Sequence, residues 1–153
     1  MFHPLIQFIT LFLLLLVIGI FWGPWFALHR SIHVFQAEEF IHIVKTMAAN
    51  LAIPMRIMMP SCLFFLLLTA WTNQTGNIWV TGLNLSAFLL MAIAVLLTML
   101  VEVPIVAQIK EWSAATIPTN WQLFRNRWVK YHVIRTSVSL ASFACFTASV
   151  LFM

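Results

Sequence analysis

The sequence predicts an all-α integral membrane four-helix bundle whose helices extend beyond the lipid on the cytoplasmic side. Three observations support this fold class. Of the 153 residues, 63% are hydrophobic and only 8% are charged, whereas a soluble domain is about 25% charged. Four stretches carry the roughly 20 apolar residues needed to cross a bilayer, and the charges lie between them. Runs such as Leu11–Ile20 are apolar on every face, which excludes the alternating strands of a β-barrel, so we expect one domain over residues 1–153.

The first two predicted helices cover residues 4–28 and 36–72. The first is uncharged, no Lys or Arg precedes it, and no small-residue cleavage site follows it, so we expect a retained helix rather than a signal peptide. The second extends upstream past Arg56 before it enters its apolar part. Pro54 and Pro60 are expected to bend it, because proline lacks the backbone N–H that a helix requires.

The other two predicted helices cover residues 78–112 and 120–152. The third passes Glu102 before it ends. The cluster Pro-Thr-Asn at 118–120 is a typical start signal for the fourth. At 1.5 Å per residue the fourth helix is about 50 Å long, whereas the hydrocarbon core is about 30 Å thick. We therefore expect one end of the bundle to project from the membrane.

All charged side chains fall in two windows, residues 30–56 and 102–135, which connect the first helix to the second and the third to the fourth. Because Lys and Arg are retained on the cytoplasmic side, both connections are expected inside and both termini outside, in a bacterial inner membrane. This orientation and contact with anionic lipid explain the net charge of +4. The predicted partner is thus the lipid bilayer, and no nucleic acid is expected.

Five aromatic and basic side chains share one face of the fourth helix. They are Trp121, Arg125, Trp128, His132 and Arg135. At 100° per residue they fall within an arc of about 80°. One interpretation is that Trp and Arg only anchor the helix at the interface. His132 and Arg135 lie deepest, where ionisable residues face the bundle interior and are functional by default, so we predict a site there, with the other three residues binding substrate.

Glu102 closes the long uncharged stretch of the third helix and is a natural counter-ion for Arg135 or Arg125. Thr98 lies on the same helical face. A structural tie between helices is the alternative to a catalytic role. We predict Glu102, His132 and Arg135 as the catalytic group, with further polar partners from the second helix and from the end of the first.

A metal site is another hypothesis. Glu39 and His42 have the Glu-x-x-His spacing of di-iron bundles, although those proteins use two such motifs and two further Glu. A mixed set of nitrogen and oxygen ligands would suit iron, copper or zinc, and a haem with a His axial ligand is a further alternative. The candidate ligands are His29, His33, Glu39, His42, Glu102 and His132. Cys62 and Cys145 stand singly, so they predict no disulfide-relay chemistry and are expected to be buried.

Two segments resemble a known family: VEVPIVAQIKEW at 101–112 and NWQLFRNRWVKYHVIRTSVSLAS at 120–142. They are similar to the anthrone-oxygenase-like family of small four-helix membrane proteins, in which Val-Pro-(Ile/Leu)-Asn closes helix three and a Trp followed by Arg-x-Trp-x-x-x-(His/Asn)-x-x-Arg-Thr opens helix four. The matching residues are Val103, Pro104, Ile105, Trp121, Arg125 or Arg127, Trp128, His132, Arg135 and Thr136. Val106 replaces the expected Asn, so this chain differs in substrate or activity if that Asn contacts substrate.

The resemblance implies an oxidation of the activated methylene of a tricyclic anthrone to an anthraquinone with O₂. His132 would act as the base that forms a carbanion, and Arg135 would hold the phenolate. The carbanion would then pass an electron to O₂ without a cofactor; a metal-dependent oxygenase is an alternative. We therefore expect a flat hydrophobic aromatic small molecule as the substrate. The competing hypothesis is a non-enzymatic membrane protein that binds, assembles or carries a partner.

Overall fold

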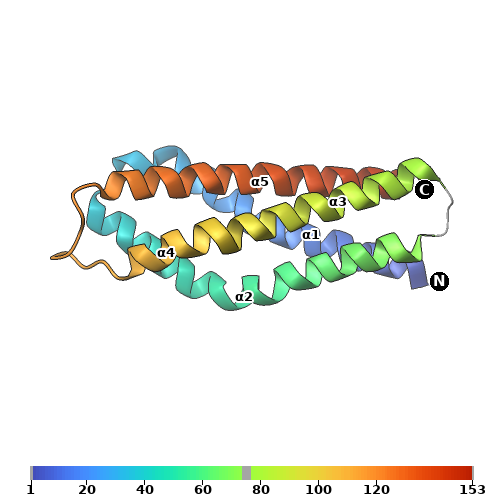
Figure 1. Cartoon of the computed structure of the whole chain (residues 1–153), viewed down its shortest axis with the longest axis horizontal. Coiled ribbons are helices and arrows are strands. Elements are labelled where there is room, and N and C mark those ends of the chain that lie inside the picture. Colours follow the sequence, from blue (N-terminus) through green and yellow to red (C-terminus); the bar gives the residue numbers. More distant parts are fainter. Residues whose placement is uncertain (1, 74–76, 153) are drawn as a thin grey trace.

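The computed structural model describes residues 2–73 and 77–152, and this part of the chain contains helices and no strand. Four long helical segments lie side by side, with both ends of the chain at the same end of the bundle (Figure 1). Each segment is long and apolar enough to span a membrane. The predicted four-helix membrane bundle is therefore confirmed. The end opposite the termini is called the loop end below.

Seven helical elements make up the four segments in the described residues. In chain order they are α1 (Phe2–Ala27), the 3₁₀-helix η1 (His29–Val34), α2 (Ala37–Thr72), α3 (Ile78–Leu97), the π-helix η2 (Thr98–Glu102), α4 (Val103–Lys110) and α5 (Trp121–Leu151). The elements α3, η2 and α4 follow one another without a break and form the third segment. The predicted helices agree with α1, α2, α3–α4 and α5 to within two residues at each end, whereas η1 lies in the predicted connection between the first two helices.

The second segment shows how local sequence sets the ends and bends of a helix. The backbone N–H of Gln36 donates to Glu39 Oε2 at 2.8 Å, and the two residues form a capping box that begins α2. The helix continues through Pro54 and Pro60. Each proline removes one backbone hydrogen bond, and α2 bows in its middle (Figure 1), as predicted.

Two apolar clusters hold the segments together. The cluster nearer the termini contains Leu14, Val17, Phe21, Met59, Cys62, Leu66, Ala87, Met91, Ala94 and Phe146. The cluster nearer the loop end contains Ile32, Phe40, Ile41, Val44, Ile105, Ile109 and Trp128. Four buried ionisable residues lie between the two clusters along the chain. They are His29 on η1, Glu102 on η2, and His132 and Arg135 on α5. We call these four residues the charged layer.

A second set of polar residues lies nearer the termini. Thr10 and Thr69 join α1 to α2 through their hydroxyls, 2.9 Å apart. Ser142 Oγ donates to the carbonyl of Ala87 at 2.7 Å, and Ser149 Oγ donates to Asn84 Oδ1 at 2.9 Å. Small hydroxyl residues let neighbouring helices approach closely, and α3 and α5 form the most extensive helix contact in the described bundle. These residues, Thr10, Thr69, Asn84, Ser142 and Ser149, are the hydroxyl seam.

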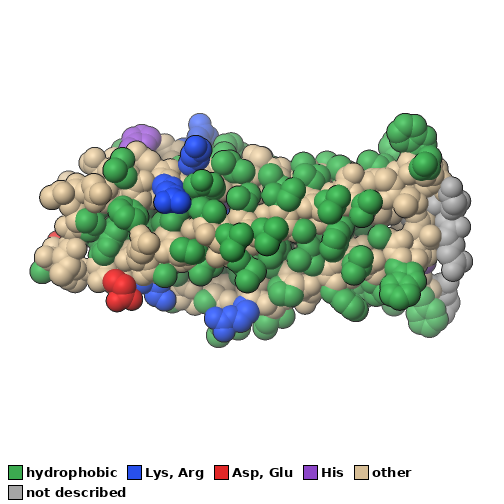
Figure 2. All heavy atoms as spheres, viewed as in Figure 1, with side chains coloured by type: hydrophobic (Ala, Val, Ile, Leu, Met, Phe, Trp, Pro, Cys, Tyr) green, Lys and Arg blue, Asp and Glu red, His purple; other side chains and the backbone are tan. Residues whose placement is uncertain are grey.

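The surface separates apolar and charged side chains along the long axis. Figure 2 shows hydrophobic side chains over most of the visible face, and its Lys, Arg and Glu side chains lie toward the loop end. Many large hydrophobic side chains are exposed, such as Phe8 and Leu89. A water-soluble protein would bury such residues, so this surface suits contact with lipid chains.

Candidate active site: a charged layer inside the bundle

The π-helix η2 positions the acidic member of the charged layer. Pro104 lacks a backbone N–H, so it cannot donate to the carbonyl one turn earlier. Just before it, the N–H of Val103 donates to the carbonyl of Thr98, five residues back. Such π-bulges are rare and are often found at functional sites. Here the bulge spans Thr98 and Glu102, and both of these side chains contact Arg135.

Arg135 and Glu102 form a buried ion pair between α5 and η2. The Nη1 group of Arg135 contacts Glu102 Oε2, and it also donates to Thr98 Oγ1 at 3.2 Å. Glu102 is 4% exposed and Arg135 is 8% exposed. The sequence offered Arg135 or Arg125 as the partner of Glu102, and in the structure the partner is Arg135. Both charged groups are buried away from water, so each is stabilised by the opposite charge of the other. Removal of one partner typically lowers the stability of the fold by about 3–5 kcal/mol.

The contacts of His132 fix its tautomer. Its Nδ1 lies 2.8 Å from Arg135 Nη2, and an arginine can only donate, so Nδ1 must accept. The hydrogen is then on Nε2, which lies 2.9 Å from the carbonyl oxygen of Phe21 and donates to it. The guanidinium carbon of Arg135 lies 4.1 Å from the centroid of the Phe21 ring, a cation–π contact. His132 is thus a neutral imidazole that links α1 to Arg135.

His29, at the start of η1, completes the layer from the side of the first segment. Its ring centroid is 4.3 Å from that of His132 and 4.7 Å from that of Trp128. Although His29 is only 5% exposed, neither of its ring nitrogens has a hydrogen-bond partner among the described residues. Glu102 Oε1 and Arg135 Nε also lack one. Buried polar atoms are nearly always paired, so these unpaired atoms make the layer a candidate ligand site. Glu102 Oε1 lies 3.9 Å from His132 Nδ1.

The predicted substrate-binding residues occupy different depths on α5. Trp128 is buried beside His29. Trp121 and Arg125 are half-buried nearer the loop end, where the Arg125 guanidinium carbon lies 5.1 Å from the Trp121 ring centroid. The Trp121 ring also packs on Phe40, 5.8 Å away between centroids. Only Trp128 of these three therefore borders the charged layer.

The structure divides the predicted metal ligands into two groups. His29, Glu102 and His132 lie in the charged layer, whereas His33, Glu39 and His42 are exposed. The Glu39 carboxylate caps its own helix. Within residues 2–73 and 77–152, no group of three or more His, Cys, Asp or Glu side chains is placed to hold a metal ion. The second helix therefore contributes no polar side chain to the layer, and its Glu38 and Arg56 are exposed as well.

One contact of the layer has no direct signal in the sequence. The carbonyl of Phe21 binds His132, and a backbone acceptor leaves no trace in a side-chain pattern. Pro24 gives no hint of it, because the N–H that a proline lacks would bind the carbonyl of Ile20, four residues earlier. Thr98 could be found more easily, since it lies one turn before Glu102 on the same helical face.

A family model described as Anthrone oxygenase matches residues 43–145, about two thirds of the chain. No curated protein and no solved structure matches. The matched region includes Thr98, Glu102, His132 and Arg135, and it begins after His29 and Phe21. The first segment, which supplies one wall of the charged layer, thus lies outside the region that the family model matches.

Proposed function

Because this chain belongs to the anthrone oxygenase family, we propose that it is a membrane oxidoreductase that uses O₂ to oxidise the activated methylene of a flat polycyclic aromatic such as an anthrone. The observation that carries the proposal is the charged layer itself. It consists of four buried ionisable residues within membrane-spanning segments. Such residues are costly in a bilayer and usually mark a functional site.

The proposed reaction requires a base that removes a proton from the substrate and a cation that stabilises the resulting negative charge. The methylene of an anthrone is acidic because loss of a proton gives an aromatic enolate. That enolate transfers one electron to O₂, the resulting radicals combine, and loss of water leaves a second carbonyl. One anthrone and one O₂ thus give one anthraquinone and one water. A positioned base typically contributes about 10²–10⁴-fold to such a rate, and a cation stabilises the enolate oxygen.

We assign proton abstraction to His29 rather than to His132, the base that the sequence suggested. The Nδ1 lone pair of His132 already accepts from Arg135, and its Nε2 is bound to Phe21. Both nitrogens of His29 are unpartnered among the described residues. In this scheme the unpartnered Nε of Arg135 donates to the enolate oxygen. His132 and Glu102 are positioning residues that hold the guanidinium in place.

The test is oxygen uptake by the purified protein in phospholipid nanodiscs when an anthrone is added. Wild type should consume one O₂ per anthrone at a rate well above the spontaneous oxidation measured with empty nanodiscs. His29→Ala should reduce kcat at least ~100-fold, as expected for loss of a general base. His33→Ala is the matched control, because His33 lies one turn away on η1 and is exposed. Equal rates for wild type and empty nanodiscs would exclude this activity.

We further propose that the loop end faces the cytoplasm of a bacterial cell. The support is the distribution of charge, since every Lys and Arg lies in the two windows at or near that end and such residues stay inside. A single cysteine introduced at Ser113, in the exposed connection between α4 and α5, should react with a membrane-impermeant maleimide only after the cells are broken. Labelling in intact cells would reverse the orientation.

A further inference from the structure

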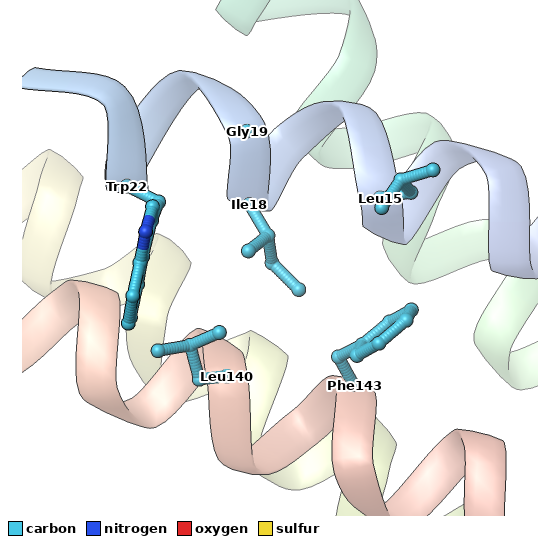
Figure 3. A pocket seen from close by; sticks show the side chains of 6 residues that line it. All are labelled: Leu15, Ile18, Gly19, Trp22, Leu140 and Phe143. Atoms are coloured by element: carbon cyan, nitrogen blue, oxygen red, sulfur yellow. The ribbon is translucent and has the colours of Figure 1, made fainter.

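A groove of about 310 Å³ runs along the outer face of the bundle between α1 and α5 (Figure 3). It is lined by Leu15, Ile18, Gly19, Trp22, Leu140 and Phe143. All of these residues are apolar. Leu15 is 54% exposed and Trp22 is 37% exposed, so the groove opens toward the surroundings of the bundle, which in a membrane are lipid chains.

Gly19 lines the groove on the α1 side and has no side chain to occupy it. A Cβ atom at position 19 would meet no other atom within 4 Å, so the space beside Gly19 is open. Figure 3 shows Trp22 and Leu140 facing each other at one end of the groove, Leu15 and Phe143 at the other, and Ile18 between them. The two aromatic side chains thus stand at opposite ends of an apolar hollow.

The end of the groove at Trp22 lies close to the charged layer along both helices. On α1, Trp22 directly follows Phe21, whose carbonyl binds His132 and whose ring lies beside Arg135. On α5, Leu140 is five residues after Arg135 of the charged layer, which is about 7.5 Å along a helix axis. The groove therefore lies near the charged layer, next to Phe21 on α1 and about one and a half turns beyond Arg135 on α5.

We propose that this groove is the membrane-side binding site from which a flat polycyclic aromatic enters the protein; the inference rests on the function proposed above. Such a substrate dissolves in the hydrocarbon core and reaches the protein from the lipid. A volume of about 310 Å³ is at the lower end of the range of small-molecule pockets, about 300–1,000 Å³. Aromatic walls favour a rigid ring system, because stacked and edge-to-face contacts add to simple burial. A flexible acyl chain is buried there as well but makes no stacked or edge-to-face ring contacts.

The experiment fills the groove and leaves the charged layer unchanged. Gly19→Leu places a side chain in open space, so the helix should fold as in wild type. Gly82→Leu is the matched control, because Gly82 is an exposed helical glycine on α3 that does not line the groove. A Cβ atom at position 82 would likewise meet no other atom within 4 Å. Binding of anthraquinone, an unreactive probe, is measured by quenching of tryptophan fluorescence in phosphatidylcholine nanodiscs.

We expect Gly19→Leu to weaken anthraquinone binding at least tenfold and Gly82→Leu to leave it unchanged. In the turnover assay, Gly19→Leu should raise KM for an anthrone with little change in kcat, because the layer is intact. Unchanged binding in Gly19→Leu, or equal loss in both variants, would overturn the inference. Binding that is lost only in Gly19→Leu, in a protein without turnover, would support the groove and refute the proposed oxidation, so the two failures are distinguishable.

Discussion

The charged layer and the hydroxyl seam are both buried and polar, yet they differ in how their atoms are paired. In the seam, neutral hydroxyls bind each other or a backbone carbonyl, as in the Thr10–Thr69 pair and in Ser142 bound to Ala87. In the layer, an ion pair and two imidazoles meet, and four of their polar atoms have no partner among the described residues, whereas in the seam one atom, Asn84 Nδ2, lacks a partner there. Neutral hydroxyl contacts suffice to join membrane helices. Buried charged groups are not needed to hold the helices together, so we assign the chemistry to the charged layer.

The largest effect should come from breaking the ion pair on one side only. Glu102→Leu leaves the guanidinium of Arg135 buried without its carboxylate, so we expect the free energy of unfolding to fall by about 3–5 kcal/mol. The double variant Glu102→Leu with Arg135→Met removes both charges and should recover most of this loss, because apolar replacement of a whole buried pair is often neutral. The measurement is reversible denaturation in detergent micelles. A double variant as unstable as the single one would show that the pair itself stabilises the bundle.

An intermediate effect is expected for His132→Ala. This change leaves the Phe21 carbonyl without its side-chain donor and removes the acceptor of Arg135 Nη2. Loss of buried hydrogen-bond partners typically costs about 1–3 kcal/mol. In the turnover assay, kcat should fall while the protein stays folded, since the guanidinium loses its orientation. Unchanged turnover in a folded variant would contradict a positioning role for His132.

The smallest effect should be in the seam. Ser142→Ala removes one hydroxyl that donates to the Ala87 carbonyl, and hydrogen bonds between membrane helices are worth about 0.6 kcal/mol on average. We expect a stability change of that size and turnover equal to that of wild type. If Ser142→Ala were as damaging as His132→Ala, the distinction between the two polar regions would not hold.

The sequence predicts most of the fold because the apolar stretches are long and the charges between them are sharply confined. Helical spacing alone also placed Trp128, His132 and Arg135 on the buried face of α5, with Arg127 and Lys130 exposed. Both results depend on local periodicity. Helical periodicity shows which face of a helix is buried, but it does not show which other helix packs against that face.

That limit explains what the sequence did not predict about the site. We expected polar partners from the second helix, but Glu39 caps its own helix and His42 is exposed. The polar partner expected from the end of the first helix is present as His29, and the Phe21 carbonyl on α1 is a further contact that was not predicted. The π-helix was also not predicted, because it results from Pro104 within a segment that packs as one long helix. Both features depend on tertiary packing.

Oxygen uptake by the double variant Glu102→Leu with Arg135→Met shows whether the charged layer performs the oxidation. This protein should remain folded and keep the groove at Gly19 intact, as anthraquinone binding would verify. If the charged layer performs the oxidation, the anthrone-dependent oxygen uptake of this variant falls to the rate of empty nanodiscs. Uptake at the wild-type rate in the folded double variant would contradict it.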